Sequence, residues 1–151
     1  MKTIKRPSDN MGGVIRMWAI PPRSISMSGK TVTIISDANV IDITVKEDSA
    51  GFTEEASDTF AGTFFKTDIT ATIPCDTDET LAIIKEMERK MKYLVIYMDG
   101  NENYKLAGSN NVPLRFSAKA STGTTAAALN NYNITFTGSQ RERAVFIDNP
   151  F

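Results

Sequence analysis

The residues that could carry out nucleophilic or metal chemistry are few in this chain. The sequence has one cysteine, Cys75, and no histidine. Cys75 lies immediately before a predicted helix, whose N-terminus could stabilise a thiolate. Without a histidine, however, a papain-type nucleophile has no general base. A zinc site would have to combine one thiolate with carboxylates, which is a poor ligand set for that metal. We therefore predict that Cys75 is a half-buried structural residue.

Five carboxylates fall within one stretch of the sequence, namely Asp42, Glu47, Asp48, Glu54 and Glu55. Two of them could act as a glycosidase pair or bind calcium, but the spacing of a calcium-binding loop is absent. No glycine-rich segment opens a helix with a lysine, as a phosphate-binding loop requires. We interpret the carboxylates as a solvated strand face and loop tip. The sequence thus predicts no catalytic residue, no metal or cofactor site and no small-molecule substrate, so the chain is predicted not to be an enzyme.

Aromatic residues recur in segments with strand-like alternation, namely Tyr93, Tyr97, Tyr104, Phe116, Tyr132 and Phe136. Together with Lys105, Arg115 and Lys119 they could stack and neutralise a nucleic acid, as in an OB-like domain. The formal net charge of −1 counts against that alternative. Because the rings occupy alternating apolar positions, we predict that they pack in the core.

The composition is that of an ordinary globular domain. The chain has 151 residues, of which 41% are hydrophobic and 23% charged, so we predict a single domain over residues 1–151. We expect an N-terminal arm at about residues 1–11 and a short tail at residues 148–151. No stretch approaches the roughly 20 apolar residues that cross a bilayer, and the basic N-terminus lacks the apolar segment of a secretory signal. We expect synthesis in a cytoplasm and no membrane partner.

One amphipathic helix is predicted at about residues 77–91. Asp76 is the expected N-cap, with Glu79 three residues later as in a capping box. The apolar residues that define one face of the helix are Leu81, Ile84, Met87 and Met91.

The other periodic segments predict an α+β, mostly β fold: an antiparallel β-sandwich or barrel flanked by that helix. The predicted strands in these segments are residues 14–20, 93–98, 104–108, 113–120, 132–138 and 143–147. Residues 93–98 are almost entirely apolar, so this strand is expected to be buried on both faces. The turn signal at residues 99–101 makes residues 104–108 its expected hairpin partner. In residues 113–120 the inward positions are Leu114, Phe116 and Ala118, and residues 121–131 form a loop of small side chains.

The first half of the chain gives further expectations. Residues 31–35 and 40–46 are predicted to pair as a hairpin around a turn at residues 37–39. Residues 47–58 are polar and indicate a long loop or an exposed hairpin tip. Residues 59–73 read as one long strand with a bend or bulge near Gly62.

This order of elements, with four turn-and-strand segments, resembles a known family. The segments that carry the resemblance are Tyr97–Asn101, Tyr104–Ser109, Pro113–Phe116 and Asn131–Gly138. They are similar to the tail-tube-like domain of virion proteins of tailed bacteriophages, a small β-sandwich or barrel flanked by one helix. The resemblance covers roughly residues 59–146 and consists of turn and strand patterns rather than chemical signatures.

The resemblance implies a structural protein of the virion. Such a protein is a self-assembling ring subunit of the tail (tail tube, tail terminator, or neck or baseplate ring) and forms part of the DNA conduit. Its partners would be further copies of itself and neighbouring virion proteins, with DNA passing through the ring without sequence recognition. The residues expected at the oligomer interface are Phe52, Glu54, Glu55, Phe60 and Phe151.

Two other classes remain open. A monomeric β-sandwich module that binds protein or carbohydrate shares every compositional feature with the ring subunit. A hydrolase that uses carboxylates alone is the least favoured class, because the sequence shows no catalytic pair with a defined spacing.

Overall fold

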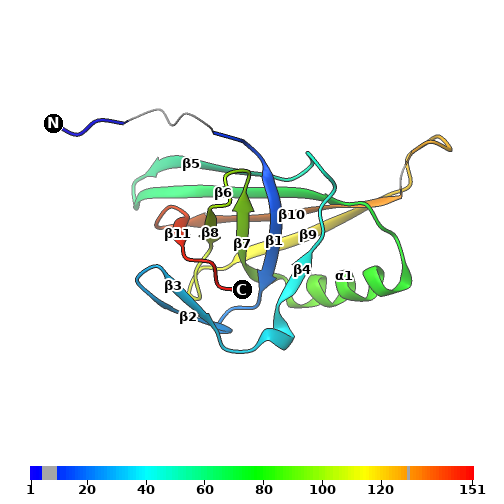
Figure 1. Cartoon of the computed structure of the whole chain (residues 1–151), viewed down its shortest axis with the longest axis horizontal. Coiled ribbons are helices and arrows are strands. Elements are labelled where there is room, and N and C mark those ends of the chain that lie inside the picture. Colours follow the sequence, from blue (N-terminus) through cyan, green and yellow to red (C-terminus); the bar gives the residue numbers. More distant parts are fainter. Residues whose placement is uncertain (5–9, 129) are drawn as a thin grey trace.

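The computed structural model describes residues 1–4, 10–128 and 130–151. It confirms a mostly β fold with an α-helix at one side (Figure 1). The strands are β1 (Val14–Ile20), β2 (Ile25–Ser28), β3 (Thr31–Ile34), β4 (Ile41–Ile43), β5 (Gly51–Thr59), β6 (Gly62–Ile73), β7 (Lys92–Asp99), β8 (Tyr104–Ala107), β9 (Leu114–Ser121), β10 (Asn131–Gln140) and β11 (Val145–Ile147). The helices are α1 (Asp78–Lys90) and the short 3-10 turn η1 (Asp37–Asn39). Residues 5–9 of the predicted arm and residue 129 of the predicted loop lie outside the described residues.

The main sheet has nine strands, and its pairing divides them into two layers. One layer has the order β5-β6-β10-β9, and the other has the order β4-β1-β7-β8-β11. The layers are joined at the start of β7, where Lys92 and Tyr93 pair with Arg115 and Leu114 of β9. The described strands end at β5 and β11 without pairing to one another, so the sheet does not close into a barrel. The fold is therefore a sandwich of antiparallel strands.

Two apolar clusters explain why β7 is buried on both faces. Between the layers, the rings of Tyr93, Phe116 and Phe136 pack with centroids 5.2–6.3 Å apart. On the other face, Leu94 and Ile96 pack against the hairpin of β2 and β3, which covers this side as a small third layer. Because every side chain from Tyr93 to Tyr97 meets apolar neighbours, the continuous apolar run in the sequence is fully buried.

The helix α1 confirms the predicted element, but its cap differs. Thr77 is the N-cap, and its side chain accepts a hydrogen bond from the Thr80 N–H at 3.2 Å. The expectation that Asp76 caps the helix was wrong, because Asp76 accepts a hydrogen bond from the Tyr132 hydroxyl at 3.0 Å instead. The tyrosine lies on β10, so a contact between distant segments prevails over the local one. The capping box with Glu79 is therefore not formed.

Replacing Thr77 with alanine is expected to lower the free energy of unfolding by about 1 kcal/mol, because the Thr80 N–H loses its acceptor. Urea denaturation of both proteins measures the difference. Glu79→Ala is the matched control, since Glu79 lies in the same turn outside the cap contact and its loss should cost only about 0.3 kcal/mol. Equal losses in the two variants would contradict the assignment of the cap to Thr77.

The predicted pairing of residues 31–35 with 40–46 was wrong. β3 pairs with β2, through a turn in which Gly29 has a φ of 62°. β4 instead pairs with β1, with Met17 opposite Ile43. The turn η1 carries the chain from the small third layer to the edge of the main sheet. Each strand therefore buries its apolar side chains against a different layer, which local alternation alone does not reveal.

Residues 51–59 are strand β5 rather than a long loop, so that part of the loop interpretation was wrong. β5 pairs with β6 along the whole length of β5, from Gly51 opposite Thr70 to Thr59 opposite Gly62. The bend expected near Gly62 is the hairpin turn itself, where Gly62 has a φ of 117°. The polar composition of β5 reflects its position at the edge of the sheet, with one face in water.

The C-terminal half follows the sequence predictions closely. β7 and β8 form the expected hairpin, and β9 and β10 pair along their length. Leu114 and Phe116 are buried and Ala118 is half-buried. The tail after β11 is packed rather than free, because the Asp148 N–H donates to the Lys30 carbonyl at 3.0 Å and Phe151 stacks on Trp18.

Candidate functional site

The five residues predicted at an oligomer interface do not form one surface. Phe52 faces the inside of the sandwich and stacks on Tyr97 with ring centroids 4.9 Å apart. Glu54 points the same way, whereas Glu55 faces solvent on the opposite side of β5. Phe60 is fully exposed at the tip of the β5–β6 hairpin. Phe151 stacks on Trp18 at 4.4 Å, outside the other layer.

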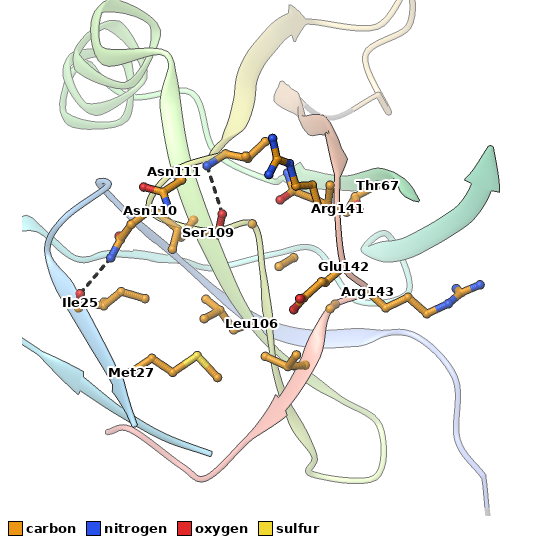
Figure 2. A pocket seen from close by; sticks show the side chains of 17 residues that line it. Ile25, Met27, Thr67, Leu106, Ser109, Asn110, Asn111, Arg141, Glu142 and Arg143 are labelled. Carbon is orange, nitrogen blue, oxygen red and sulfur yellow. Dashed lines mark hydrogen bonds between the residues drawn. The ribbon is translucent and has the colours of Figure 1, made fainter. Parts of the chain in front are cut away.

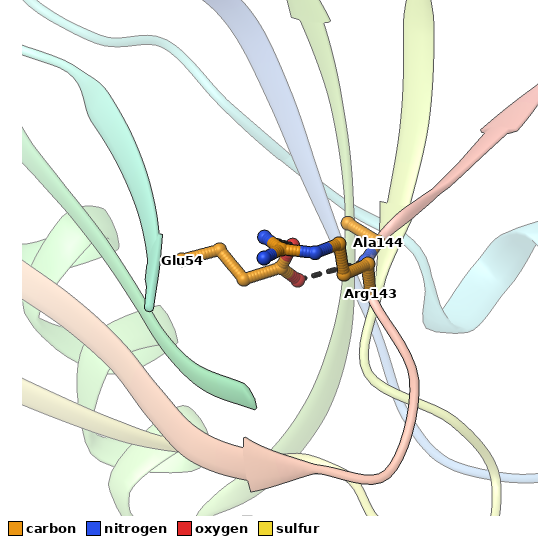
Figure 3. Close-up of polar contacts among 3 residues, drawn as sticks. All are labelled: Glu54, Arg143 and Ala144. Carbon is orange, nitrogen blue, oxygen red and sulfur yellow. Dashed lines mark hydrogen bonds and ion pairs between the residues drawn. The ribbon is translucent and has the colours of Figure 1, made fainter. Parts of the chain in front are cut away.

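Glu54 anchors the segment that joins β10 to β11. Its side chain is only 8% exposed. One carboxylate oxygen accepts the Ala144 backbone N–H at 2.8 Å, and the other accepts Arg143 Nη1 at 3.2 Å (Figure 3). The Arg143 guanidinium also lies over the ring of Phe65 at 4.6 Å. A single carboxylate on the edge strand therefore fixes residues 143–144, just before β11.

A pocket of about 590 Å³ lies beside this anchored segment. It is bounded by β2, by the connection from β8 to β9, and by residues 140–145 (Figure 2). Asn110 fixes one wall: its Oδ1 accepts the Arg23 N–H at 2.8 Å, and its Nδ2 donates to the Ile25 carbonyl at 3.2 Å. The volume falls in the range of small-molecule sites, which is roughly 300–1,000 Å³.

Two polar atoms of residues that line this pocket have no hydrogen-bond partner among the described residues, and both atoms are covered, with almost no exposed surface of their own. They are Thr67 Oγ1 and Gln140 Nε2, from side chains that are 1% and 5% exposed. Their strands place them as diagonal neighbours on the inner face, because Thr67 lies opposite Gly138 and Phe65 lies opposite Gln140. Buried polar groups are normally satisfied, so these two atoms mark a place where a partner is missing.

The sequence did not identify this pocket. The signal was present, because Thr67 is a polar residue at an inward position between Phe65 and Ile69. Gln140 likewise continues the inward series of Phe136 and Gly138. A polar side chain at an inward position of an alternating strand is unusual. Whether it marks a pocket depends on which residues of other strands lie near it in the fold.

The other candidates from the sequence occupy structural positions. Cys75 is half-buried, and its sulfur accepts the Thr80 hydroxyl at 3.4 Å. Asp42 pairs with Arg16 at 3.0 Å, with both side chains more than half exposed. Among the residues that the structure describes, no three of His, Cys, Asp and Glu are grouped as metal ligands would be. Within the same residues, no helix has both the length and the apolar character that spanning a membrane requires.

The aromatic residues predicted to lie in the core are mostly found there. Tyr93, Tyr97, Phe116, Tyr132 and Phe136 are buried, and Tyr104 is half-buried. Burial raises the pKa of the Tyr93 hydroxyl to about 12. Burial, followed by the charges of Glu54 and Asp99, also raises the pKa of Tyr97. Both hydroxyls therefore stay protonated and uncharged at neutral pH, as their burial in the core requires.

Comparison with known proteins gave no relative, since no family model, no curated protein sequence and no solved structure matches this chain.

Proposed function

We propose that this chain is a structural subunit of a tailed bacteriophage virion, which self-assembles into a ring of the tail or neck. The observation that carries the proposal is the free edge of β5. This strand is nine residues long and pairs only with β6 among the described strands. A long unpaired edge is a template for strand addition by another chain, and natural monomers normally shorten or cover it.

The charges on β5 favour one kind of contact. Glu55 and Asp58 are exposed on this strand, whereas Glu54 is already paired with Arg143 inside the chain. Antiparallel pairing of β5 with β5 of a second copy would bring like charges together, which is unfavourable. A head-to-tail contact with a different surface avoids that repulsion, and contacts of this type can close into a ring.

The tip of the β5–β6 hairpin offers an apolar side chain at the C-terminal end of β5. Phe60 is fully exposed there, in the turn that projects from the end of the sheet (Figure 1). An exposed aromatic ring contributes nothing to the stability of a monomer, but it is an effective anchor when a partner buries it. The edge of β5 and its tip thus offer backbone groups and an anchor side by side.

Replacing Phe60 with serine is expected to leave the monomer folded and to abolish assembly. The wild-type chain should form a discrete ring as its concentration rises, measured by sedimentation velocity and seen by negative-stain electron microscopy. At low concentration, where the wild-type chain is monomeric, the melting temperature should be the same in the variant, because the aromatic ring of Phe60 makes no packing contact within the monomer. Ile35→Ser is the matched control, since Ile35 is also exposed but lies outside the hairpin.

A wild-type chain that stays monomeric at millimolar concentration would contradict the ring proposal. The pocket beside residues 140–145 would then favour the second candidate, a monomeric binding module.

A further inference from the structure

The pocket has walls of two chemical kinds. The apolar wall includes Ile25, Leu106 and Val145. Met27 joins it and is partly exposed, so a flexible apolar side chain lies at the rim. The polar wall contains the unpartnered atoms of Thr67 and Gln140. A molecule that satisfies both walls has an apolar group and, close to it, at least one hydrogen-bond acceptor.

The acceptor is defined by the unpartnered groups. Gln140 Nε2 can only donate, and the Thr67 hydroxyl can donate or accept. The two groups are diagonal neighbours on one face of the sheet, so one oxygen with two lone pairs can be approached by both. A carbonyl or carboxylate oxygen of the bound molecule is the partner that both groups lack.

The charge balance of the pocket favours a neutral carbonyl. Arg141 and Glu142 both line it, and neither forms an ion pair with another described residue. Figure 2 shows the Glu142 side chain extending into the pocket, whereas Arg143 points away from it, towards its partner Glu54. With one positive and one negative group present, a full negative charge on the bound molecule gains little. No aromatic side chain lines the pocket, so the stacking platform that sugar rings favour is missing there.

We propose that this pocket binds an amide carbonyl flanked by an apolar side chain, the chemistry of a short peptide segment. The apolar side chain packs against Ile25, Leu106 and Val145. The side chains of Gln140 and Thr67, whose polar atoms are covered in the unliganded structure, turn towards the pocket and donate hydrogen bonds to the carbonyl oxygen. A volume of about 590 Å³ accommodates two or three residues rather than one. The proposal is independent of ring assembly, because all of these residues belong to one copy of the chain.

The probe is a blocked tripeptide, acetyl-Ala-Leu-Ala-amide, titrated into the full chain and followed by backbone amide chemical shifts. Saturable shift changes are expected at residues 25–27, 106–112 and 140–145. The serine analogue acetyl-Ala-Ser-Ala-amide should bind more weakly, because it leaves the apolar wall empty. Acetyl-leucine carries the same apolar side chain but a free carboxylate in place of the amide. If it binds more tightly than the tripeptide, the pocket is a site for a small acid rather than for a peptide. Weaker binding of acetyl-leucine supports the peptide proposal.

Two variants test the polar wall. Thr67→Val and Gln140→Leu are each expected to weaken binding of the tripeptide about tenfold, the loss of one hydrogen bond. Thr70→Val is the matched control, since Thr70 lies on the same strand but faces solvent, and it should bind as the wild type does. Unchanged affinity in both Thr67→Val and Gln140→Leu, or no saturable shift with the wild type, would overturn the proposal. These titrations are made at concentrations where the chain is monomeric, so their result does not depend on ring formation.

Discussion

Replacing Glu54 with alanine is expected to lower the free energy of unfolding by about 2–3 kcal/mol. The substitution removes the acceptor of the Ala144 N–H, a backbone group in a half-buried segment. It also removes the partner of Arg143, but the Arg143 side chain is 56% exposed and can turn to water, so the ion pair contributes the smaller part. Urea denaturation should show a lower midpoint with an unchanged slope.

The neighbouring residue provides the control for this prediction. Glu55→Ala removes the same chemical group from the exposed face of β5, and the change should stay within about 0.5 kcal/mol. Arg143→Ala should cost about 1 kcal/mol or less, because the bond from the Ala144 N–H to Glu54 remains. If Glu54→Ala and Glu55→Ala proved equal, residues 143–144 would not be anchored by Glu54.

Replacing Gly138 with alanine is expected to lower the free energy of unfolding by about 1–3 kcal/mol. A Cβ atom at this position would lie 3.0 Å from Leu114 Cδ2 and 3.3 Å from Gln140 Nε2. Leu114 is completely buried and cannot withdraw. The Gln140 amide would have to move, so the substitution also disturbs the polar wall of the pocket.

Gly51 is the matched control, since it is also a strand glycine. A Cβ atom on Gly51 would meet nothing within 4 Å. Gly51→Ala should therefore be neutral or stabilising by up to about 1 kcal/mol, because alanine restricts the unfolded chain. Thermal and urea denaturation of the two variants would show the contrast. Equal destabilisation of both would mean that the loss of glycine flexibility, rather than crowding at Leu114, controls the effect.

The sequence predicted the elements whose apolar pattern is strong in itself. The helix at residues 78–90 has a complete apolar face, and β7 is an unbroken apolar run, so both were located to within a residue or two. The β7–β8 hairpin was found from its turn at residues 99–101. These elements are specified by information a few residues apart.

The sequence failed where the local pattern is short or polar, and where a distant contact decides. Residues 51–59 are polar, so nothing local distinguishes a loop from an edge strand. Thr31–Ile34 pairs with β2, whose alternation of apolar and polar residues covers only four positions, Ile25 to Ser28. The Asp76 carboxylate left the helix cap because Tyr132 of β10 reaches it. Only the Asp76 contact depends on a distant element, whereas β3 and β5 pair with strands next to them in the sequence, where the local pattern was too short or too polar to be recognised.

The candidate site was beyond prediction for the same reason. Thr67 and Gln140 are separated by a long stretch of sequence, and only the register of β6 and β10 brings them together. Glu54 was singled out as an interface residue, whereas its carboxylate is engaged inside the same chain. The absence of histidine, by contrast, follows from composition alone, and it excludes a histidine general base or a histidine metal ligand without any knowledge of the fold.

The packing around Trp18 makes its fluorescence sensitive to the position of Phe151. Trp18 is the sole tryptophan of the sequence. Phe151 stacks on its ring at 4.4 Å, and the Arg16 guanidinium lies 5.0 Å from the ring centroid. The fluorescence of Trp18 therefore reports whether Phe151 is packed on the indole. Departure of Phe151 would admit water to the indole and shift the emission to longer wavelength. Movement of the C-terminus can thus be followed without attaching a dye.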